Sequence, residues 1–189
     1  EFIALVLSAK YNTLKTQGNL NNEIGVPQML FRLEDSHTAA VIEMGMNHFG
    51  EISRLTRAVA PTVGLITNIG VSHIENLGSR AGILQAKLEI LEGMAPDAPL
   101  IVNMDNDMLR TVKLGDRPLL TFAIDDQSAD FTATDIAEQG STTTFTVHHS
   151  TFNQPVTIPT VGIHNVYNAL AAMAVGYVTG VNPAAAASA

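Results

Sequence analysis

The sequence contains no cysteine. This absence excludes disulfides, thiolate metal ligands and cysteine nucleophiles. It fits a reducing compartment, and we therefore expect a cytoplasmic protein. Long hydrophobic runs are absent too, since none reaches the ~18 residues that a membrane-spanning helix needs. Because hydrophobic residues still make up 46% of the chain, the composition predicts a soluble globular domain with a sizeable core.

Positive charge is scarce as well. The chain has 10 Lys and Arg against 18 Asp and Glu, which gives a formal net charge of -8. Non-specific binding to nucleic acid depends on cations that meet phosphates, so no polynucleotide surface is expected. A site for one small anionic ligand stays open, because metal ions or helix N-termini can supply the positive potential.

The two ends of the sequence suggest a piece of a longer protein. The chain begins at Glu1, without an initiator Met and inside a helix-like stretch. It ends in Asn182-Pro183 and an Ala-rich tail, which is typical of the first turn of a helix. We expect one domain over residues 1–180, and over residues 181–189 the start of a linker or helix toward a further domain.

Up to Pro118, short apolar runs alternate with helical patterns. Strands are expected at residues 39–44, 62–67 and 99–102, and helices at residues 1–10, 26–33, 52–59 and 80–94. This alternation predicts an α/β fold in which a mostly parallel sheet is flanked by helices.

After Pro118 the pattern changes to short, often Thr-containing strands separated by polar turns. These strands are expected at residues 119–123, 130–134, 142–147 and 155–158. They predict a small antiparallel subsheet over about residues 118–160, followed by a helix at residues 164–177.

Polar side chains stand where the three apolar runs of the first part end. They are Glu43, Asn68, and Asn103 with Asp105, and His73 follows shortly after Asn68. Because ligands bind beyond the carboxyl ends of parallel strands, we expect these residues to gather at one edge of the sheet. A carboxylate and a neutral imidazole there can hold Mg²⁺ together with water and phosphate oxygens. Alternatively, Glu43 caps a turn and His73 is an ordinary loop residue.

Lys87 stands within an apolar stripe of the helix predicted at residues 80–94. Ile83, Leu84, Ile90 and Leu91 lie three or four positions from it. One interpretation is a lysine whose stem packs while its ammonium reaches water. The other is a desolvated lysine with a lowered pKa, which can act as a base or add carbon dioxide to become a metal-binding carbamate.

Two further segments carry amide side chains that can bind a polar ligand. At the start of the last helix, Asn165 and Asn168 with His164 can present donors and acceptors to a base edge such as that of adenine, or they can simply cap the helix. The loop at residues 18–25 contains Asn21 and Asn22, and either cradles a polar ligand or forms a tight turn. No GxSxG, HExxH or GxxxxGK[ST] motif occurs.

Taken together, six segments in this order resemble the central domain of the Mur ligases, ATP-dependent amide ligases of peptidoglycan precursor synthesis. Within that family, the second segment favours the member that adds D-alanyl-D-alanine to UDP-N-acetylmuramoyl-tripeptide. The segments are residues 18–27, 43–52, 67–73, 86–90, 103–106 and 162–169.

The resemblance implies a mechanism and a set of roles. ATP phosphorylates the terminal carboxylate of the tripeptide, and the amine of D-alanyl-D-alanine then displaces phosphate. The resemblance implies that Glu43 and His73 bind Mg²⁺ and that Lys87 is a carbamylated lysine positioning a second metal ion. It places Asn168, with His164 and Asn165, on the adenine side, and assigns Asn21 and Asn22 to a phosphate or substrate loop.

The family's glycine-rich phosphate loop and its N-terminal and C-terminal domains are missing from this sequence. We therefore expect little or no ligase activity from the chain alone. Two other interpretations stay open: another Mur ligase or a folylpolyglutamate synthetase-like ligase, and a non-catalytic nucleotide-binding domain on the same fold.

Overall fold

The computed structural model describes all 189 residues. Its strands form a two-stranded sheet of order β1-β2 and a six-stranded sheet of order β3-β4-β5-β6-β7-β8. The strands are β1 (Thr13–Lys15), β2 (Ala39–Val41), β3 (Gly64–Ile66), β4 (Leu100–Asn103), β5 (Leu119–Ala123), β6 (Phe131–Gln139), β7 (Thr142–His149) and β8 (Phe152–Ile158). Pairing is parallel from β3 to β6 and within β1-β2, and antiparallel from β6 to β8. The predicted fold class is confirmed.

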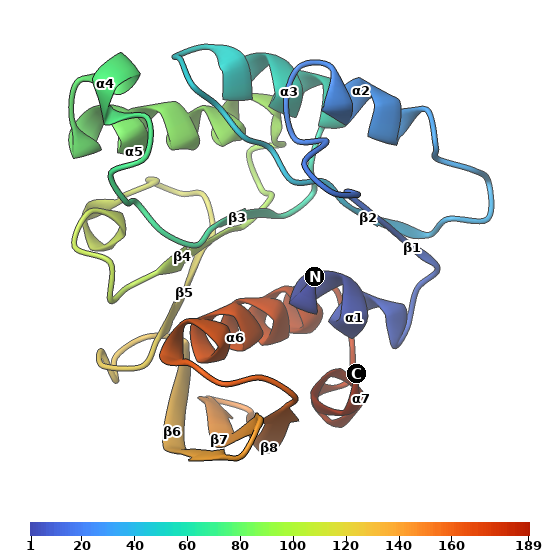
Figure 1. Cartoon of the computed structure of the whole chain (residues 1–189), viewed down its shortest axis with the longest axis vertical. Helices are drawn as coiled ribbons and strands as arrows, with labels where there is room; N and C mark the ends of the chain where they lie inside the picture. Colours follow the sequence, from blue (N-terminus) through green and yellow to red (C-terminus); the bar gives the residue numbers. More distant parts are fainter.

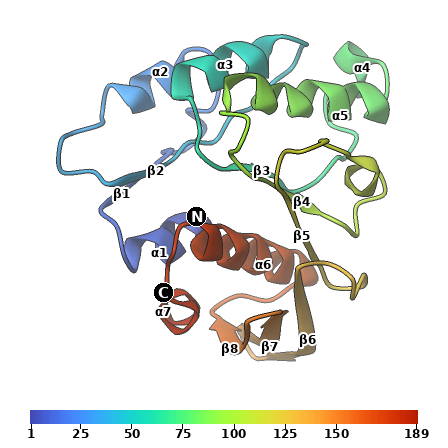
Figure 2. The same ribbon diagram turned by 180° about the vertical axis from the view of Figure 1, so that it is seen from behind.

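Helices cover both faces of the strand layer (Figures 1 and 2). The helices α2, α3 and α5 lie over one face, whereas α1 and α6 lie over the other. The α-helices are α1 (Phe2–Ser8), α2 (Gly25–Leu30), α3 (Glu51–Val59), α4 (Ile74–Leu77), α5 (Arg80–Leu88), α6 (Ile163–Val178) and α7 (Pro183–Ser188), and the 3₁₀ helices are η1 (Glu89–Gly93) and η2 (Leu109–Thr111). No helix combines the length and the apolar composition that crossing a membrane requires.

Alternation along the central strands divides the core into two clusters. Ile101 packs in the cluster formed with α6, and its neighbours Leu100 and Val102 pack in the cluster formed with α3 and α5. All three side chains are fully buried. A strand covered on both faces reads as a continuous apolar run, which is why the sequence marks β4 so clearly.

The prediction for residues 119–123 was wrong in strand direction. This strand, β5, is parallel to β4, and β6 is in turn parallel to β5, so the antiparallel part begins only at β6. The short polar connection at residues 124–130 looks like a hairpin turn. It can join two parallel strands because they overlap only at Phe122↔Phe131 and Ala123↔Thr132, so β6 starts where β5 ends.

The helix predicted over residues 80–94 was also too long. The α-helix ends at Leu88 and continues as the 3₁₀ helix η1. The 3₁₀ helix lies close against α3: a Cβ on Gly93 would lie 2.2 Å from the backbone of Thr56, and the Thr56 hydroxyl donates a 2.7 Å hydrogen bond to the Ile90 carbonyl. The sequence pattern gave no sign of the short elements β1 and α4.

Candidate functional site

Polar residues gather around a cavity where β3 and β4 end and α6 begins. The cavity has a volume of about 360 Å³. Its lining residues are Thr67, Asn68, Asn103, Asp105, Asn106, Phe122, His164, Tyr167 and Asn168. Of the residues predicted to gather at one edge, Asn68, Asn103 and Asp105 do line this cavity, whereas Glu43 and His73 do not. The topology explains why the first three meet, because adjacent parallel strands deliver their carboxyl ends to the same side.

Asn106 holds the two strand ends together. Its Nδ2 donates to Asn68 Oδ1 at 2.7 Å, while its Oδ1 accepts the backbone N–H groups of Met108 (3.2 Å) and Leu109 (3.0 Å). This fixes the Asn68 amide with its oxygen on Asn106, and leaves its NH₂ group without a partner in the chain. Sequence reasoning did not single out Asn106, since nothing in its local pattern reveals a contact 38 residues away.

The first two turns of α6 present His164 and Asn168 to the cavity. Neither side chain makes a hydrogen bond within the chain, and no side chain caps the helix, so the capping alternative does not hold. Gly162 precedes the helix with φ of +101°, a conformation that favours glycine. Asn165 points to the preceding loop instead, where its Nδ2 donates to Thr160 Oγ1 at 3.0 Å and to the Val161 carbonyl at 2.8 Å.

Lys87 lies in the last turn of α5, half-buried beside the end of β3. Its Nζ donates to the backbone oxygen of Asn68 at 2.9 Å and has no carboxylate partner. Burial lowers the pKa of the Lys87 ammonium. Of the two interpretations of this residue, the structure favours the desolvated lysine over the one whose ammonium reaches water.

Glu43 follows β2 and is fixed by the loop after β1. Asn21 Nδ2 donates to Glu43 Oε1 at 2.7 Å, and the Gly45 N–H donates to the Asn21 carbonyl, also at 2.7 Å. The Glu43 N–H donates to Thr16 Oγ1 at 2.8 Å. The Glu43 Oε2 atom has no partner and faces solvent, so the carboxylate is oriented and still free to bind a cation.

Asn22 behaves differently from its neighbour. Its Oδ1 accepts the backbone N–H groups of Ile24 (3.1 Å) and Gly25 (2.9 Å), where α2 begins. This is the tight-turn alternative for the loop. The two asparagines therefore have different structural roles: Asn21 contacts Glu43, and Asn22 stabilises the turn.

His73 opens α4 with a left-handed backbone, φ of +65°, and an exposed ring that makes no hydrogen bond. No group of three or more His, Asp or Glu residues lies close enough to hold a metal ion. Glu43 Oε2, the His73 ring and the Lys87 amine nevertheless each keep a ligand atom free. No contact in the structure joins these three side chains into one ligand set.

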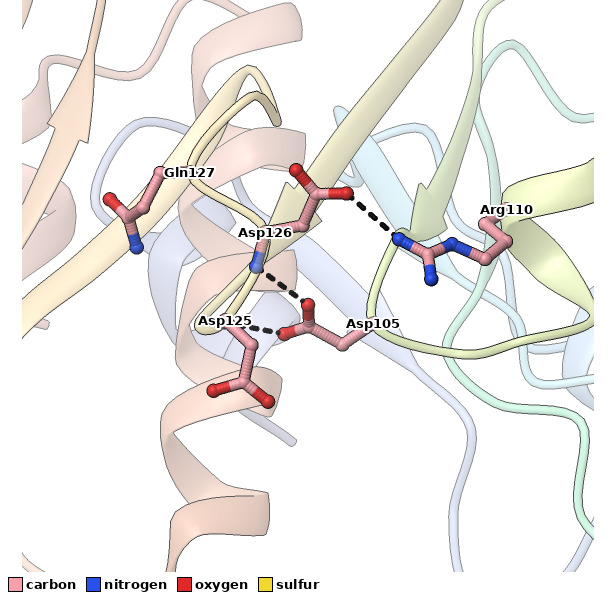
Figure 3. Close-up of a pocket in the computed structure, with 5 residues that line it drawn as sticks. All are labelled: Asp105, Arg110, Asp125, Asp126 and Gln127. Carbon is pink, nitrogen blue, oxygen red and sulfur yellow. Dashed lines mark hydrogen bonds and ion pairs between the residues drawn. The ribbon is translucent and has the colours of Figure 1, made fainter.

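A second cavity of about 440 Å³ adjoins the first at Asp105 and has no apolar lining residue. It is lined by Asp105, Arg110, Asp125, Asp126 and Gln127 (Figure 3). Arg110 pairs with Asp126 at 3.0 Å across its mouth. Burial acts to raise the pKa of Asp105, but hydrogen bonds from three backbone N–H groups and from Tyr167 outweigh it, so the net shift is downward. The Asp105 carboxylate is thus an ionised acceptor.

Parallel strands that are covered by helices on both faces, with polar residues at the strand ends, define an α/β domain of the doubly wound type. Residues 1–176 match the family model described as the Mur ligase middle domain. The chain belongs to the Mur ligase family.

Sequence relatives and solved structures of the same family agree with this assignment. The UDP-N-acetylmuramoyl-tripeptide--D-alanyl-D-alanine ligase of Escherichia coli (strain K12) is 41% identical over 95% of this chain and 40% of its own length. MurF from Acinetobacter baumannii superposes with a TM-score of 0.92 at 35% identity, over 99% of this chain and 41% of that one. The MurF ligase of Thermotoga maritima in complex with ADP shares the fold, with a TM-score of 0.88 at 24% identity over 100% of this chain and 44% of that one. The chain therefore spans about two fifths of the length of these proteins.

Proposed function

We propose that this chain is the middle part of an ATP-dependent, cytoplasmic ligase that joins D-alanyl-D-alanine to UDP-N-acetylmuramoyl-tripeptide. The observation that carries the proposal is the 41% identity, over 95% of the chain, to the Escherichia coli ligase of that name. Further domains of the same polypeptide would complete the sites for the UDP group and for the incoming amine.

The cavity between β4 and α6 supports a site for the adenine of ATP. Its volume of about 360 Å³ falls within the range of small-ligand pockets. The Asn168 amide is free of other partners and offers one donor and one acceptor side by side, the pattern that pairs with an adenine edge. Asn68 adds a free NH₂ group and His164 a ring. Asn165 would support this turn through the loop at residues 160–162.

Glu43, His73 and Lys87 support the metal part of the proposal. Bound Mg²⁺ would neutralise the negative charge that develops on the transferring phosphoryl group. Glu43 would bind it through Oε2 while Asn21 holds Oε1, and His73 would bind it through its ring. A neutral Lys87 amine can add carbon dioxide and release one proton, and the resulting carbamate would offer oxygen ligands in a set whose only carboxylate is Glu43. Asn22 would contribute to the loop at residues 18–25 only by stabilising its turn, and would not contact the phosphate or the substrate itself.

The test is turnover by the full-length protein. ADP release would be followed with UDP-N-acetylmuramoyl-tripeptide, ATP and Mg²⁺, and D-alanyl-D-alanine would be compared with single amino acids and with glutamate as the amine. We expect turnover that depends on D-alanyl-D-alanine, and little or none from the 189-residue chain alone. Turnover with a different amine would assign the chain to another member of the family. Folded protein that uses no amine would overturn the proposal in favour of a non-catalytic nucleotide-binding domain.

A further inference from the structure

The start of α6 is tied to the segment that follows β4 by one hydrogen bond. Tyr167 Oη donates to Asp105 Oδ2 at 2.8 Å. The two residues are 62 positions apart, and both line the cavity assigned above to adenine. No other side chain on the cavity face of α6 makes a hydrogen bond, because His164 and Asn168 have no partner in the chain.

Asp105 is a fixed anchor for this bond. Its Oδ2 also accepts the backbone N–H groups of Ile124 (2.6 Å) and Asp125 (2.9 Å), and its Oδ1 accepts that of Asp126 (2.9 Å). Figure 3 shows the carboxylate facing the turn that leads from β5 to β6. With four donors on two oxygens, the carboxylate has little freedom to rotate and no need of a cation. It joins the end of β4, the turn after β5 and the start of α6.

Tyr167 and the two ligand-facing residues lie on one face of the helix. His164, Tyr167 and Asn168 are spaced i, i+3 and i+4, so a rotation of α6 that moves one of them moves the others with it. We propose that Tyr167, held by Asp105, is a positioning residue that sets the rotation of α6 and thereby aims the Asn168 amide at the nucleotide base. This inference rests on the proposed function, because it assumes a nucleotide in the cavity. Burial raises the pKa of the Tyr167 hydroxyl, with the bond to Asp105 adding to the shift, so the hydroxyl remains a donor at neutral pH.

The chain supplies a matched control at the other end of the same helix. Tyr11 Oη donates to the carbonyl of Thr179, the residue that follows α6. Both tyrosine hydroxyls therefore tether α6, one beside the cavity and one far from it. Tyr167→Phe and Tyr11→Phe each delete one hydroxyl and keep the ring. Both variants are expected to lose some stability, whereas only Tyr167→Phe is expected to change the orientation of the Asn168 amide toward the base.

The experiment measures binding of ADP and of inosine diphosphate to the full-length protein by calorimetry. Inosine diphosphate keeps the sugar and phosphates but replaces the adenine amino group by a carbonyl. We expect Tyr167→Phe to weaken ADP binding about fivefold, as loss of one hydrogen bond predicts, and to weaken inosine diphosphate binding less. The preference for ADP should fall. Tyr11→Phe should keep the wild-type preference even if its melting temperature drops.

A second variant provides an independent test of the same hydrogen bond if Tyr167→Phe folds poorly. Asp105→Ala removes both acceptor oxygens, and with them the bond to Tyr167, while the Tyr167 ring is kept, so the same loss of preference is expected from it. An unchanged preference in both cavity variants, or an equal loss in Tyr11→Phe, would overturn the inference. Wild-type protein that binds neither nucleotide would instead refute the proposed function, so the two failures are distinguishable.

Discussion

The Lys87 ammonium lies 2.9 Å from the backbone oxygen of Asn68, and this neutral carbonyl is its only hydrogen-bond partner. A lysine whose ammonium is taken out of water is usually paired with a carboxylate, because desolvation disfavours the charged form. Here the bond instead holds the amine against the end of β3, beside the residue whose side chain lines the cavity. The arrangement costs stability and favours the neutral amine that carbamylation requires.

Lys87→Met should therefore abolish turnover in the full-length protein, by at least about a hundredfold, without lowering its stability. The charged lysine carries a desolvation penalty in the folded state, so the substitution should raise the melting temperature at neutral pH. The matched control is Lys113→Met, because Lys113 is exposed and unpaired and should change neither property. A Lys87→Met protein that keeps near-wild-type turnover would exclude a role for the amine.

The pH dependence of that stability difference has a defined sign. The folded state releases the Lys87 proton at a lower pH than the unfolded chain does, because burial lowers the pKa in the folded state. The penalty is fully present below the folded pKa. It fades as the pH rises toward the ordinary lysine value of ~10.4. Denaturation of wild type and Lys87→Met between pH 7 and that value should show the two stabilities converging, whereas a constant difference would mean that Lys87 is solvated.

Substitution by alanine should affect different properties at Asn21 and at Asn22: the Mg²⁺ requirement at Asn21 and the stability at Asn22. Asn21→Ala releases Glu43 Oε1 from its 2.7 Å hydrogen bond, so the Mg²⁺ concentration for half-maximal activity should rise about tenfold, the usual effect of losing a partner of a metal ligand. Asn22→Ala removes the acceptor for the Ile24 and Gly25 N–H groups. It should cost about 1 kcal/mol of stability and leave the Mg²⁺ requirement unchanged. Magnesium titrations and urea denaturation of both variants give the comparison, and a shared phenotype would refute the division of roles.

Part of this site was predictable because the end of a buried strand is visible in the sequence as an apolar run followed by a polar residue. Apolar runs that stop at Asn68 and Asn103 place those residues at one edge as soon as the strands are parallel. The apolar stripe around Lys87 gives a desolvated lysine as one of two interpretations. The bond between Asp105 and Tyr167 and the contact between Asn21 and Glu43 were not predictable in this way. They depend on how separate segments come together, and neither periodicity nor composition records that.

The two errors in the fold have the same origin. The direction of β5 depends on its offset from β6, since a short polar connection serves a hairpin and a staggered parallel pair equally well. The change from α5 to η1 occurs where the chain packs against α3, a contact that the local pattern does not record. In both cases a neighbouring element, and not the local sequence, decides the outcome.

Asn165 and Asn168 give a second pair with separable effects. Asn168→Ala should raise the KM for ATP about tenfold and leave the melting temperature unchanged, because its amide has no partner in the chain. Asn165→Ala breaks the bonds to Thr160 Oγ1 and to the Val161 carbonyl, so it should cost about 1–3 kcal/mol of stability before any effect on KM is seen. Steady-state kinetics and thermal denaturation on the same preparations separate the two. A stability loss in Asn168→Ala would show that this amide serves the fold rather than the nucleotide.

Gly93 offers the clearest test of the contact between η1 and α3. A Cβ at this position would lie 2.2 Å from the Thr56 backbone, and backbone atoms cannot move aside as a flexible side chain can. Gly93→Ala should therefore destabilise the chain by about 3 kcal/mol, the upper end for overpacking. The control is Gly70→Ala, where the nearest atom would be Asn68 Nδ2 at 3.7 Å, an ordinary contact. That change should be neutral or stabilise by about 0.4–1 kcal/mol. Urea denaturation decides between them, and equal stabilities would mean that α3 and η1 can separate enough to accept a methyl group at Gly93.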